Sequence, residues 1–278
     1  MENKQKEKVW FITGSSRGFG KIWTEAALKR GDKVAATARN INSIAALKET
    51  YGDQVLVLEV DVTNAFQVQN AVNQANEYFG RLDIVFNNAG YSLVGTIEEG
   101  STEEVKAMYE TNIIGPIHVV QAALPILRAQ GHGHILGTSS AVGIYSNPLI
   151  GYYCSSKFAF EAIYDSLSKE VAGFGIKVTL IEPGAYSTEF GSAESLKIAS
   201  KKLSDYDDLK SNLMKNLQKL ERGNPLATPD AIFAVVDAEN PPLRLLLGKN
   251  DLPHIQQIYT ERIQEWEAWK PISQAAQG

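Results

Sequence analysis

Short apolar runs alternate with longer amphipathic stretches along most of the chain. The apolar runs are predicted to be strands and lie at Val9–Thr13, Lys33–Ala38, Gln54–Glu59, Leu82–Phe86, His134–Gly137, Lys177–Ile181 and Leu243–Leu247. The amphipathic stretches are predicted to be helices and lie at residues 18–30, 42–50, 64–79, 102–129, 153–173, 205–221 and 229–238. Several runs lack the period-two alternation of a half-exposed strand, which indicates that both faces of the sheet are covered.

Strands and helices that alternate in this way predict right-handed crossovers and a parallel sheet. We therefore expect an α/β fold with a doubly wound, seven-stranded sheet and helices on both faces, as a single domain over residues 1–278. Residues 185–224 interrupt the rhythm and predict a loop and helix insertion that binds the substrate, with a solvated helical excursion as the alternative. Residues 253–269 have apolar positions at helical spacing, and we expect this helix to pack on its own chain rather than on a partner.

Composition and charge narrow the class of protein. Hydrophobic residues make up 44% of the 278 positions, charged residues 21%, and the net charge is −5, which is ordinary for a globular protein and argues against a general nucleic-acid surface. The single cysteine, Cys154, excludes an intramolecular disulfide. No apolar run reaches the roughly 20 residues of a membrane span, and the charged N-terminus does not resemble a signal peptide. We expect a cytoplasmic protein without a membrane or nucleic-acid partner.

A glycine-rich loop joins the first predicted strand to the first predicted helix. Its order is GxxxGxG, and glycines at these places permit a tight turn and close packing. The helix that follows offers unpaired N–H groups to a pyrophosphate. The loop therefore predicts a dinucleotide site, and the residues expected to bind the cofactor are Gly14, Ser16, Arg17, Gly18, Phe19 and Gly20.

The end of the second strand favours NADP(H) over NAD. Folds that use NAD commonly place a carboxylate there for the ribose 2′-hydroxyl, and this chain has Arg39 instead. A guanidinium suits a 2′-phosphate, and Arg17 in the glycine loop could supply a second one. Two solvated surface arginines are the alternative.

Asp61 and Val62 end the third strand, where they could meet the adenine ring. The Asp61 carboxylate could accept a hydrogen bond from the adenine amino group. A helix cap is the alternative role for Asp61, although Thr63 or Asn64 would cap the next helix better.

Tyr153 and Lys157 are four residues apart, so both side chains lie on one face of a helix. A cation near a phenol favours the phenolate and lowers the tyrosine pKa from about 10 towards the working range. Ser140 stands thirteen residues before Tyr153. Alone, the pair is common by chance, and two exposed residues on a helix are the alternative.

Together these motifs resemble the short-chain dehydrogenase/reductase family in its single-domain, Rossmann-type form. The matching residues occur in family order: Thr13-Gly14-x3-Gly18-x-Gly20, Asp61, Asn87-Asn88-Ala89-Gly90, Asn112, Ser140, Tyr153-x3-Lys157, and Pro183-Gly184 with Thr188. The likeness fades after about residue 190, in the region where such proteins usually choose their substrates.

The resemblance implies a role for each matching residue. Tyr153 would donate a proton to a carbonyl oxygen, Ser140 would orient that oxygen, and Lys157 would lower the tyrosine pKa and hold the nicotinamide ribose. Asn112 would hold a water in a proton relay. The remaining cofactor contacts would come from Asn88, Ala89, Gly90, Pro183, Gly184 and Thr188.

The implied activity is NADPH-dependent reduction of a ketone, or oxidation of a secondary alcohol, without a metal. The expected substrate-facing residues are mostly apolar or aromatic, which favours a hydrophobic ketone; they are Ser140, Tyr145, Tyr153, Tyr186 and Phe190. The resemblance also implies a homodimer or homotetramer. A non-catalytic NADP-binding regulator of the same fold, or a member acting on steroids or 3-oxoacyl groups, is the alternative.

Overall fold

A seven-stranded parallel sheet forms the centre of the computed structural model, which describes residues 7–189 and 195–278. Its strand order is β3-β2-β1-β4-β6-β7-β9. The strands are β1 (Val9–Ile12), β2 (Lys33–Ala38), β3 (Val55–Glu59), β4 (Ile84–Asn87), β6 (Gly133–Thr138), β7 (Ile176–Pro183) and β9 (Arg244–Leu247). The order reverses between β1 and β4, so the carboxyl ends of these neighbours open the crevice in which doubly wound sheets bind ligands. The predicted fold class and its seven strands are confirmed.

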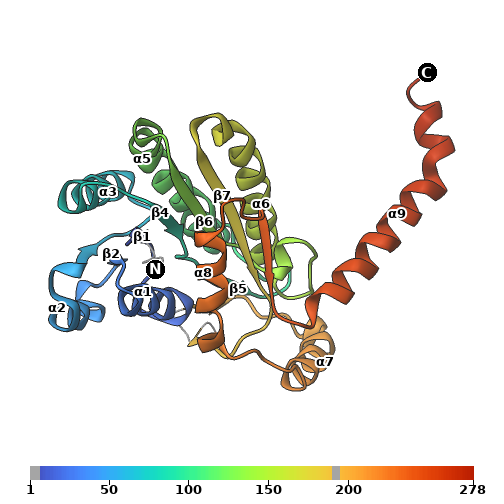
Figure 1. The fold of residues 1–278 in the computed structure, drawn as a ribbon. Helices are drawn as coiled ribbons and strands as arrows, with labels where there is room; N and C mark the ends of the chain where they lie inside the picture. Colours follow the sequence, from blue (N-terminus) through green and yellow to red (C-terminus); the bar gives the residue numbers. More distant parts are fainter. Residues whose placement is uncertain (1–6, 190–194) are drawn as a thin grey trace.

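Helices cover both faces of the sheet (Figure 1). Helices α3, α5 and α6 pack on one face, while α1 and α8 pack on the other. The helix bounds are α1 (Gly18–Arg30), α2 (Ala45–Tyr51), α3 (Ala65–Phe79), α4 (Thr102–Tyr109), α5 (Gly115–Gln130), α6 (Gly151–Val171), α7 (Asp207–Gln218), α8 (Pro229–Asp237) and α9 (Asp251–Ala275).

The sequence of β1 does not alternate between apolar and polar residues because both faces of the strand are buried. Val9 and Phe11 join the hydrophobic cluster under α3, α5 and α6, whereas Trp10 and Ile12 join the cluster under α1 and α8. All four side chains are fully buried. Because successive side chains of a strand point to opposite faces, a strand covered on both sides must be apolar throughout.

The predicted helix at residues 102–129 is continuous but not uniform. It consists of α4, a π-helical turn at Glu110–Ile114, and α5. Its first turn has the predicted capping box, because the Ser101 hydroxyl accepts from the Glu104 N–H and the Glu104 carboxylate accepts from the Ser101 N–H. The π turn carries Asn112, and such turns often occur at functional sites.

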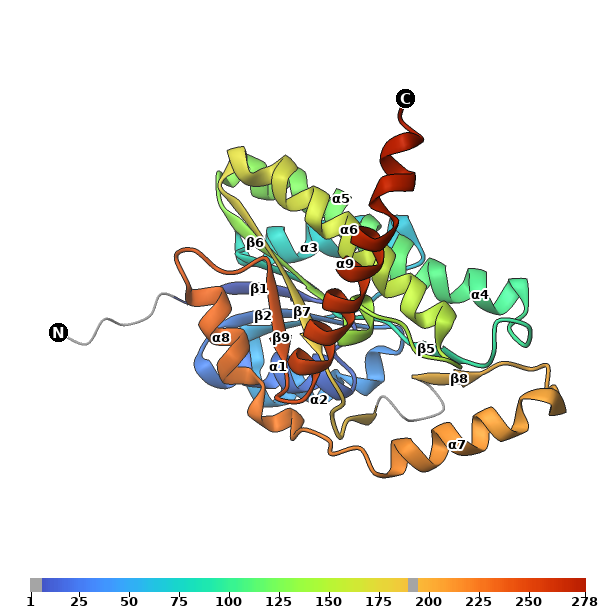
Figure 2. The same ribbon diagram turned by 90° about the vertical axis from the view of Figure 1, so that its right-hand side faces the viewer.

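A second, two-stranded parallel sheet pairs β5 (Ser92–Val94) with β8 (Leu196–Ile198). The sequence did not predict it, because each strand has only three residues and the two lie about a hundred residues apart. Strand β8 and α7 belong to the expected 185–224 insertion, and Figure 2 shows both on the same side of the molecule as β5. The insertion therefore returns to the carboxyl edge of the main sheet.

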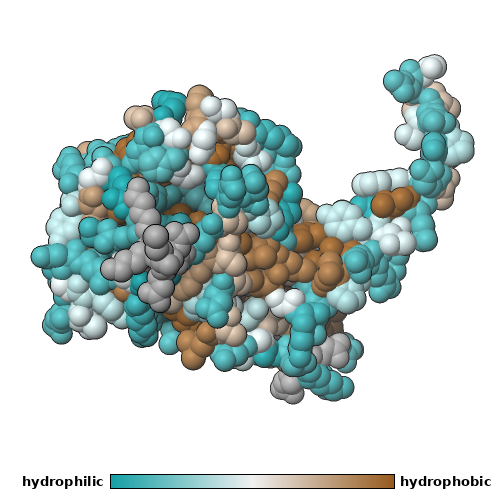
Figure 3. Space-filling view, in the orientation of Figure 1, coloured by the Kyte–Doolittle hydropathy of each residue, from teal (hydrophilic) through white to brown (hydrophobic). Residues whose placement is uncertain are grey.

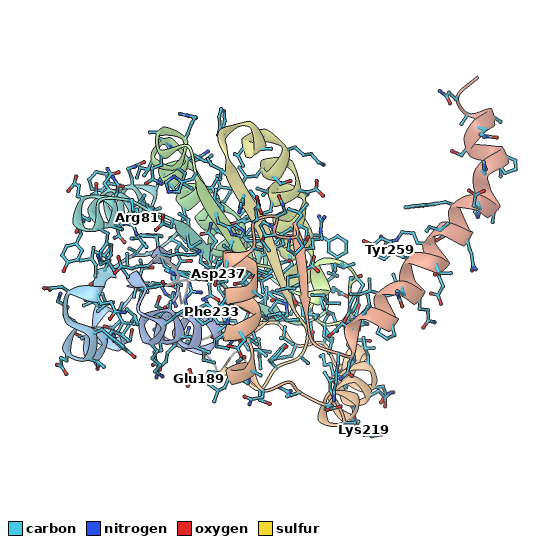
Figure 4. The ribbon with its side chains drawn as sticks, in the orientation of Figure 1. Arg81, Glu189, Lys219, Phe233, Asp237 and Tyr259 are labelled. Carbon is cyan, nitrogen blue, oxygen red and sulfur yellow. The ribbon has the colours of Figure 1, made fainter. Side chains whose placement is uncertain are left out.

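Helix α9 begins near the expected position but does not pack along its own chain. Ile255 is its one buried residue, whereas Trp266 and Trp269 are 66% and 61% exposed. The helix projects from the body in Figures 1 and 2, and hydrophobic residues gather where it departs (Figure 3). Tyr259 already lies on the projecting part (Figure 4). The expectation of packing on the same chain is thus wrong beyond the first turns, because helical spacing of apolar residues does not specify what covers them.

Candidate active site

Ser140 and Tyr153 meet at the carboxyl end of β6. Ser140 follows that strand and Tyr153 lies in the first turn of α6. Their hydroxyl groups form a hydrogen bond, and the Ser140 hydroxyl also lies 3.3 Å from the carbonyl oxygen of Pro183, to which it can donate. The arrangement holds a hydroxyl pair at the edge where doubly wound sheets bind ligands.

Lys157 lies one turn after Tyr153 and is almost entirely buried. Its Nζ donates to the Thr138 carbonyl at 2.7 Å and lies 5.7 Å from the centre of the Tyr153 ring. Burial lowers the pKa of Lys157 to about 8, and the nearby Glu161 carboxylate opposes this decrease. The site therefore keeps a positive charge near neutral pH but holds it weakly.

Burial also decides the protonation of Tyr153. It raises the pKa of the phenol above its ordinary value, and the hydrogen bond to Ser140 only partly opposes the rise. The sequence predicted the opposite direction, because it placed a cation near the phenol without knowing that both groups would be buried. Tyr153 is consequently a neutral phenol at physiological pH, which is the form that can donate a proton.

Asn112 uses its side chain to fix the neighbouring backbone. Its Oδ1 accepts from the Tyr91 N–H at 3.0 Å, and its Nδ2 donates to the Tyr91 carbonyl at 2.9 Å and to the Ser156 hydroxyl at 3.1 Å. A Cβ atom at Gly90 would lie 3.2 Å from Asn112 Oδ1 and 3.8 Å from Lys157 Nζ. The structure thus brings Asn112 Oδ1 and Lys157 Nζ close to the same face of Gly90, and the relay through a water stays a prediction.

The glycine loop is shaped by close backbone approach. Gly14 and Gly18 have φ values of +71° and +54°, which disfavour other residues. A Cβ atom at Gly14 would lie 3.0 Å from the Ala89 Cα, and one at Gly20 would overlap the Gly14 carbonyl and the Asn88 side chain. Helix α1 has no side-chain cap and no acidic residue in its first turn. These features fit a pyrophosphate at the helix N-terminus.

Asn88 braces this loop rather than merely leaving space for a ribose. Its Nδ2 donates to the carbonyl oxygens of Thr13 and Gly14 at 3.1 and 3.2 Å. The Thr13 hydroxyl in turn accepts from the backbone N–H groups of Asn88 and Ala89. The sequence suggested only small residues near the cofactor here, and no local pattern signals this contact between β1 and β4.

Arg17 and Arg39 lie close enough for their positive charges to interact. Burial lowers the pKa of Arg17 and the charge of Arg39 adds to this effect, while Glu189 opposes it. Arg39 is exposed, and the Arg17 Nε donates to the Ser195 hydroxyl at 2.9 Å. Two guanidinium groups so placed suit a 2′-phosphate, and one of them also contacts the insertion.

Asp61 forms a local turn. Its Oδ1 accepts from both the backbone N–H and the hydroxyl of Thr63, at 3.0 and 2.8 Å. The cap of α3 is Asn64, whose side chain accepts from two backbone N–H groups. Val62 is buried, and its carbonyl oxygen lies 3.0 Å from His118 Nδ1. The adenine contacts of Asp61 and Val62 stay predictions.

The residues that follow β7 contact the end of β9 and the start of α9. The Gly184 N–H donates to the Leu247 carbonyl at 2.9 Å, and the Asp251 carboxylate fills the place of a Gly184 side chain. The Thr188 N–H donates to the Tyr186 carbonyl at 2.9 Å. The Tyr186 ring lies edge-on to Phe19, with ring centres 5.3 Å apart. Tyr186 is therefore beside the glycine loop.

Tyr145 contacts the start of α9, which the sequence did not predict. Its hydroxyl donates to Asp251 Oδ1 at 3.3 Å, and its ring lies edge-on to His254 at 4.8 Å. Tyr145 and Ile255 also share a small hydrophobic cluster. The first turns of α9 thus pack against the segment that follows Ser140. Phe190, another expected substrate-facing residue, lies outside the described residues.

Metal clusters and membrane spans are both absent from residues 7–189 and 195–278. These residues contain no group of three or more histidine, cysteine, aspartate or glutamate side chains arranged to hold a metal ion. None of their helices is both long enough and apolar enough to cross a membrane.

The seven-stranded doubly wound fold is that of a short-chain dehydrogenase. A sequence model described as short chain dehydrogenase matches residues 8–198, and the chain belongs to this family. It is an oxidoreductase that acts on carbonyl or alcohol groups.

Several relatives match over nearly the full chain. Oxidoreductase BOA17 of Botryotinia fuckeliana is 37% identical over 97% of this chain and 99% of its own length. The 3-ketodihydrosphingosine reductase of Bacteroides thetaiotaomicron is 34% identical over 95% of this chain and 93% of its own length. The crystal structure of a short-chain dehydrogenase from Streptomyces avermitilis has a TM-score of 0.90 at 30% identity, and the match covers 98% of this chain and 99% of that one.

Proposed function

We propose that the protein is an NADP(H)-dependent carbonyl reductase and secondary alcohol dehydrogenase. The observation that carries this proposal is the hydrogen-bonded Ser140–Tyr153 pair with buried Lys157 one turn away, at the sheet edge shared with the glycine loop. A bound NADP(H) supplies the hydride. The protein's part is to hold the carbonyl and to provide its proton.

In the direction of reduction, Tyr153 gives its hydroxyl proton to the carbonyl oxygen. The Ser140 hydroxyl hydrogen-bonds the same oxygen and fixes its position. Lys157 supplies a positive charge beside the phenolate that remains, and it holds the nicotinamide ribose. Because its pKa is raised, Tyr153 keeps its proton at neutral pH until the carbonyl oxygen accepts it. The phenolate that then forms attracts the Lys157 ammonium and favours its charged form.

The central test compares two neighbouring tyrosines. NADPH consumption is measured with a panel of aryl and alicyclic ketones for wild type, Tyr153→Phe and Tyr152→Phe. Tyr152 is the matched control, because its hydroxyl donates to the Ile97 carbonyl at 2.7 Å. We expect turnover to fall at least a hundredfold, on the order of a lost general acid, in Tyr153→Phe only. Absence of turnover by wild type across the panel would favour a non-catalytic regulator.

The preference for NADPH rests on Arg39 and Arg17. Arg39→Asp replaces an exposed cation at the end of β2 with a carboxylate that repels a 2′-phosphate and accepts from a ribose hydroxyl. We expect the ratio of kcat/KM values to move from NADPH towards NADH by at least tenfold. Arg262→Asp on the projecting helix α9 is the control. An unchanged ratio in Arg39→Asp would mean that the 2′-phosphate is bound elsewhere.

A hydrophobic ketone is the proposed substrate class. Tyr145, with its hydrophobic cluster at the root of α9, supports this choice. So does the family relative that is named for 3-ketodihydrosphingosine. The 185–224 insertion is proposed to cover the substrate, since β8 joins it to β5 just beyond Gly90. Turnover confined to sugar phosphates or acyl-carrier thioesters would contradict the proposal.

A further inference from the structure

Three carboxyl groups surround one guanidinium behind the proposed active site. Arg244, the first residue of β9, donates from Nε to Glu161 and from Nη2 to Asp165, both at 2.9 Å. Its Nε also lies 3.6 Å from a carboxyl oxygen of Glu182. Glu161 and Asp165 come from α6, and Glu182 comes from β7. Lys169 also pairs with Asp165, so Arg244 is left as the cation that Glu161 and Glu182 share.

Glu161 and Glu182 are the buried members of this cluster, with exposed fractions of 7% and 2%. In each, Oε1 is buried and no N–H or O–H donor within the described chain reaches it. The two carboxyl groups approach each other at Arg244, whose Nε lies 2.9 Å from Glu161 Oε2 and 3.6 Å from Glu182 Oε1. Two buried carboxylates at one guanidinium repel each other, and neither can donate to the other, which favours retention of a proton by one of them.

The pair lies directly behind the residues that perform the proposed chemistry. Glu161 is one turn after Lys157, and its charge raises the pKa of that lysine. A Cβ atom placed on Gly143 would lie 3.2 Å from Glu161 Cγ and 3.3 Å from Lys157 Cβ. Glu182 precedes Pro183, whose carbonyl oxygen lies within reach of the Ser140 hydroxyl. A change of charge on the pair therefore acts on both ends of the site.

We propose that Glu161 and Glu182 share a single proton and act together as positioning residues, with the remaining negative charge holding Lys157 in its ammonium form. This inference rests on the proposed function, because it assigns the pair to Lys157 and Ser140 of that site. The charged groups that face the pair are Lys157 and Asp165 on α6 and Arg244 on β9, and Asp165 also pairs with Lys169.

The charge balance explains why one proton is retained. With one proton, the pair carries a single negative charge, which lies between the Arg244 guanidinium and the Lys157 ammonium and attracts both. Loss of that proton to solvent would leave two negative charges in a buried site with one arginine between them. Burial and the neighbouring Glu161 charge accordingly raise the pKa of Glu182 to about 8.

The first test needs no turnover and so is independent of the proposed function. Infrared spectroscopy of the whole protein at pH 7 is compared for wild type, Glu161→Gln, Glu182→Gln and Asp165→Asn. We expect a protonated-carboxyl band in wild type and Asp165→Asn, and its loss in either glutamine variant, because an amide then donates to the remaining carboxylate. Absence of the band from wild type, or its persistence in both glutamine variants, would overturn the shared proton.

The second test concerns Lys157 and uses an aryl ketone that the panel shows to be turned over. In Glu161→Gln, the alkaline limb of the kcat/KM profile should move about one pH unit lower, because Lys157 loses a neighbouring negative charge. Glu182→Gln retains that charge on Glu161 and should keep the limb in place. Asp165→Asn should also keep it, since Asp165 lies two turns beyond Lys157. Equal shifts in all three variants would indicate a merely structural cluster and refute the positioning role.

Discussion

Gly20→Ala should weaken the whole cofactor loop, although Gly20 lies inside a helix where alanine is normally preferred. The added methyl group would overlap the Gly14 carbonyl and the Asn88 amide. Asn88 would lose its two hydrogen bonds to the loop, each worth about 1 kcal/mol. Overpacking costs about 1–3 kcal/mol more, and the helix propensity of alanine returns about 1 kcal/mol. The expected net loss is therefore about 2–4 kcal/mol.

Alanine variants of two other glycines serve as controls, because they change glycine to alanine without a steric clash. A Cβ atom at Gly18 or Gly173 would meet nothing within 4 Å, and only Gly18 has a positive φ, of +54°. Gly18→Ala should cost about 1–2 kcal/mol for its backbone conformation, whereas Gly173→Ala should be neutral or slightly stabilising. Urea unfolding, followed by the fluorescence of buried Trp10 and Trp23, measures all three variants. The reasoning fails if Gly20→Ala unfolds at the same urea concentration as Gly173→Ala.

Three further predictions concern buried or terminal polar groups. Tyr164→Phe removes the 2.8 Å bond from Asn87 Nδ2 and should cost about 1–3 kcal/mol in urea unfolding, since the buried amide keeps only a 3.4 Å contact; an unchanged midpoint would contradict this. Burial lowers the pKa of His134 from 6.5 to about 3, so its contribution to stability is present above pH 6.5 and is lost as the pH falls towards 3. Between pH 7 and 5 wild type should therefore lose about 2 kcal/mol more than His134→Gln, and parallel urea curves would refute this. Ser101→Ala breaks the capping box of α4 and should cost about 1 kcal/mol, measured as a lower midpoint than that of Ser166→Ala.

Local patterns predicted the fold well because the central strands, such as β1 and β4, are covered on both faces. The four residues of β1 serve two separate cores, so they form an unbroken apolar run that differs plainly from the amphipathic helices. The same logic placed the glycine loop between β1 and α1, and the tyrosine–lysine pair on one face of α6. Ser140 then joined the pair because parallel strands end at one edge.

Contacts between distant segments were not predictable in this way. Strand β5 pairs with β8 through only three residues, Asn88 reaches back to the loop after β1, and Arg244 of β9 contacts both Glu161 of α6 and Glu182 of β7. Each contact depends on where the assembled chain places a side chain, and none leaves a periodic signal. Helix α9 shows the opposite situation. Its apolar residues have clear helical spacing, but that spacing does not show that Trp266 and Trp269 are exposed.

Burial also changes the chemistry that a motif implies. The spacing of Tyr153 and Lys157 suggested that the cation would lower the tyrosine pKa, and this would hold for two groups in a polar setting. In the folded chain both are buried, so the pKa of the phenol rises while that of the ammonium falls to about 8. Both shifts favour the neutral form of each group, and the Glu161 charge is what opposes this for Lys157. The Glu161 charge therefore helps to keep Lys157 a cation while Tyr153 is still a neutral phenol, before a phenolate is present to favour the ammonium.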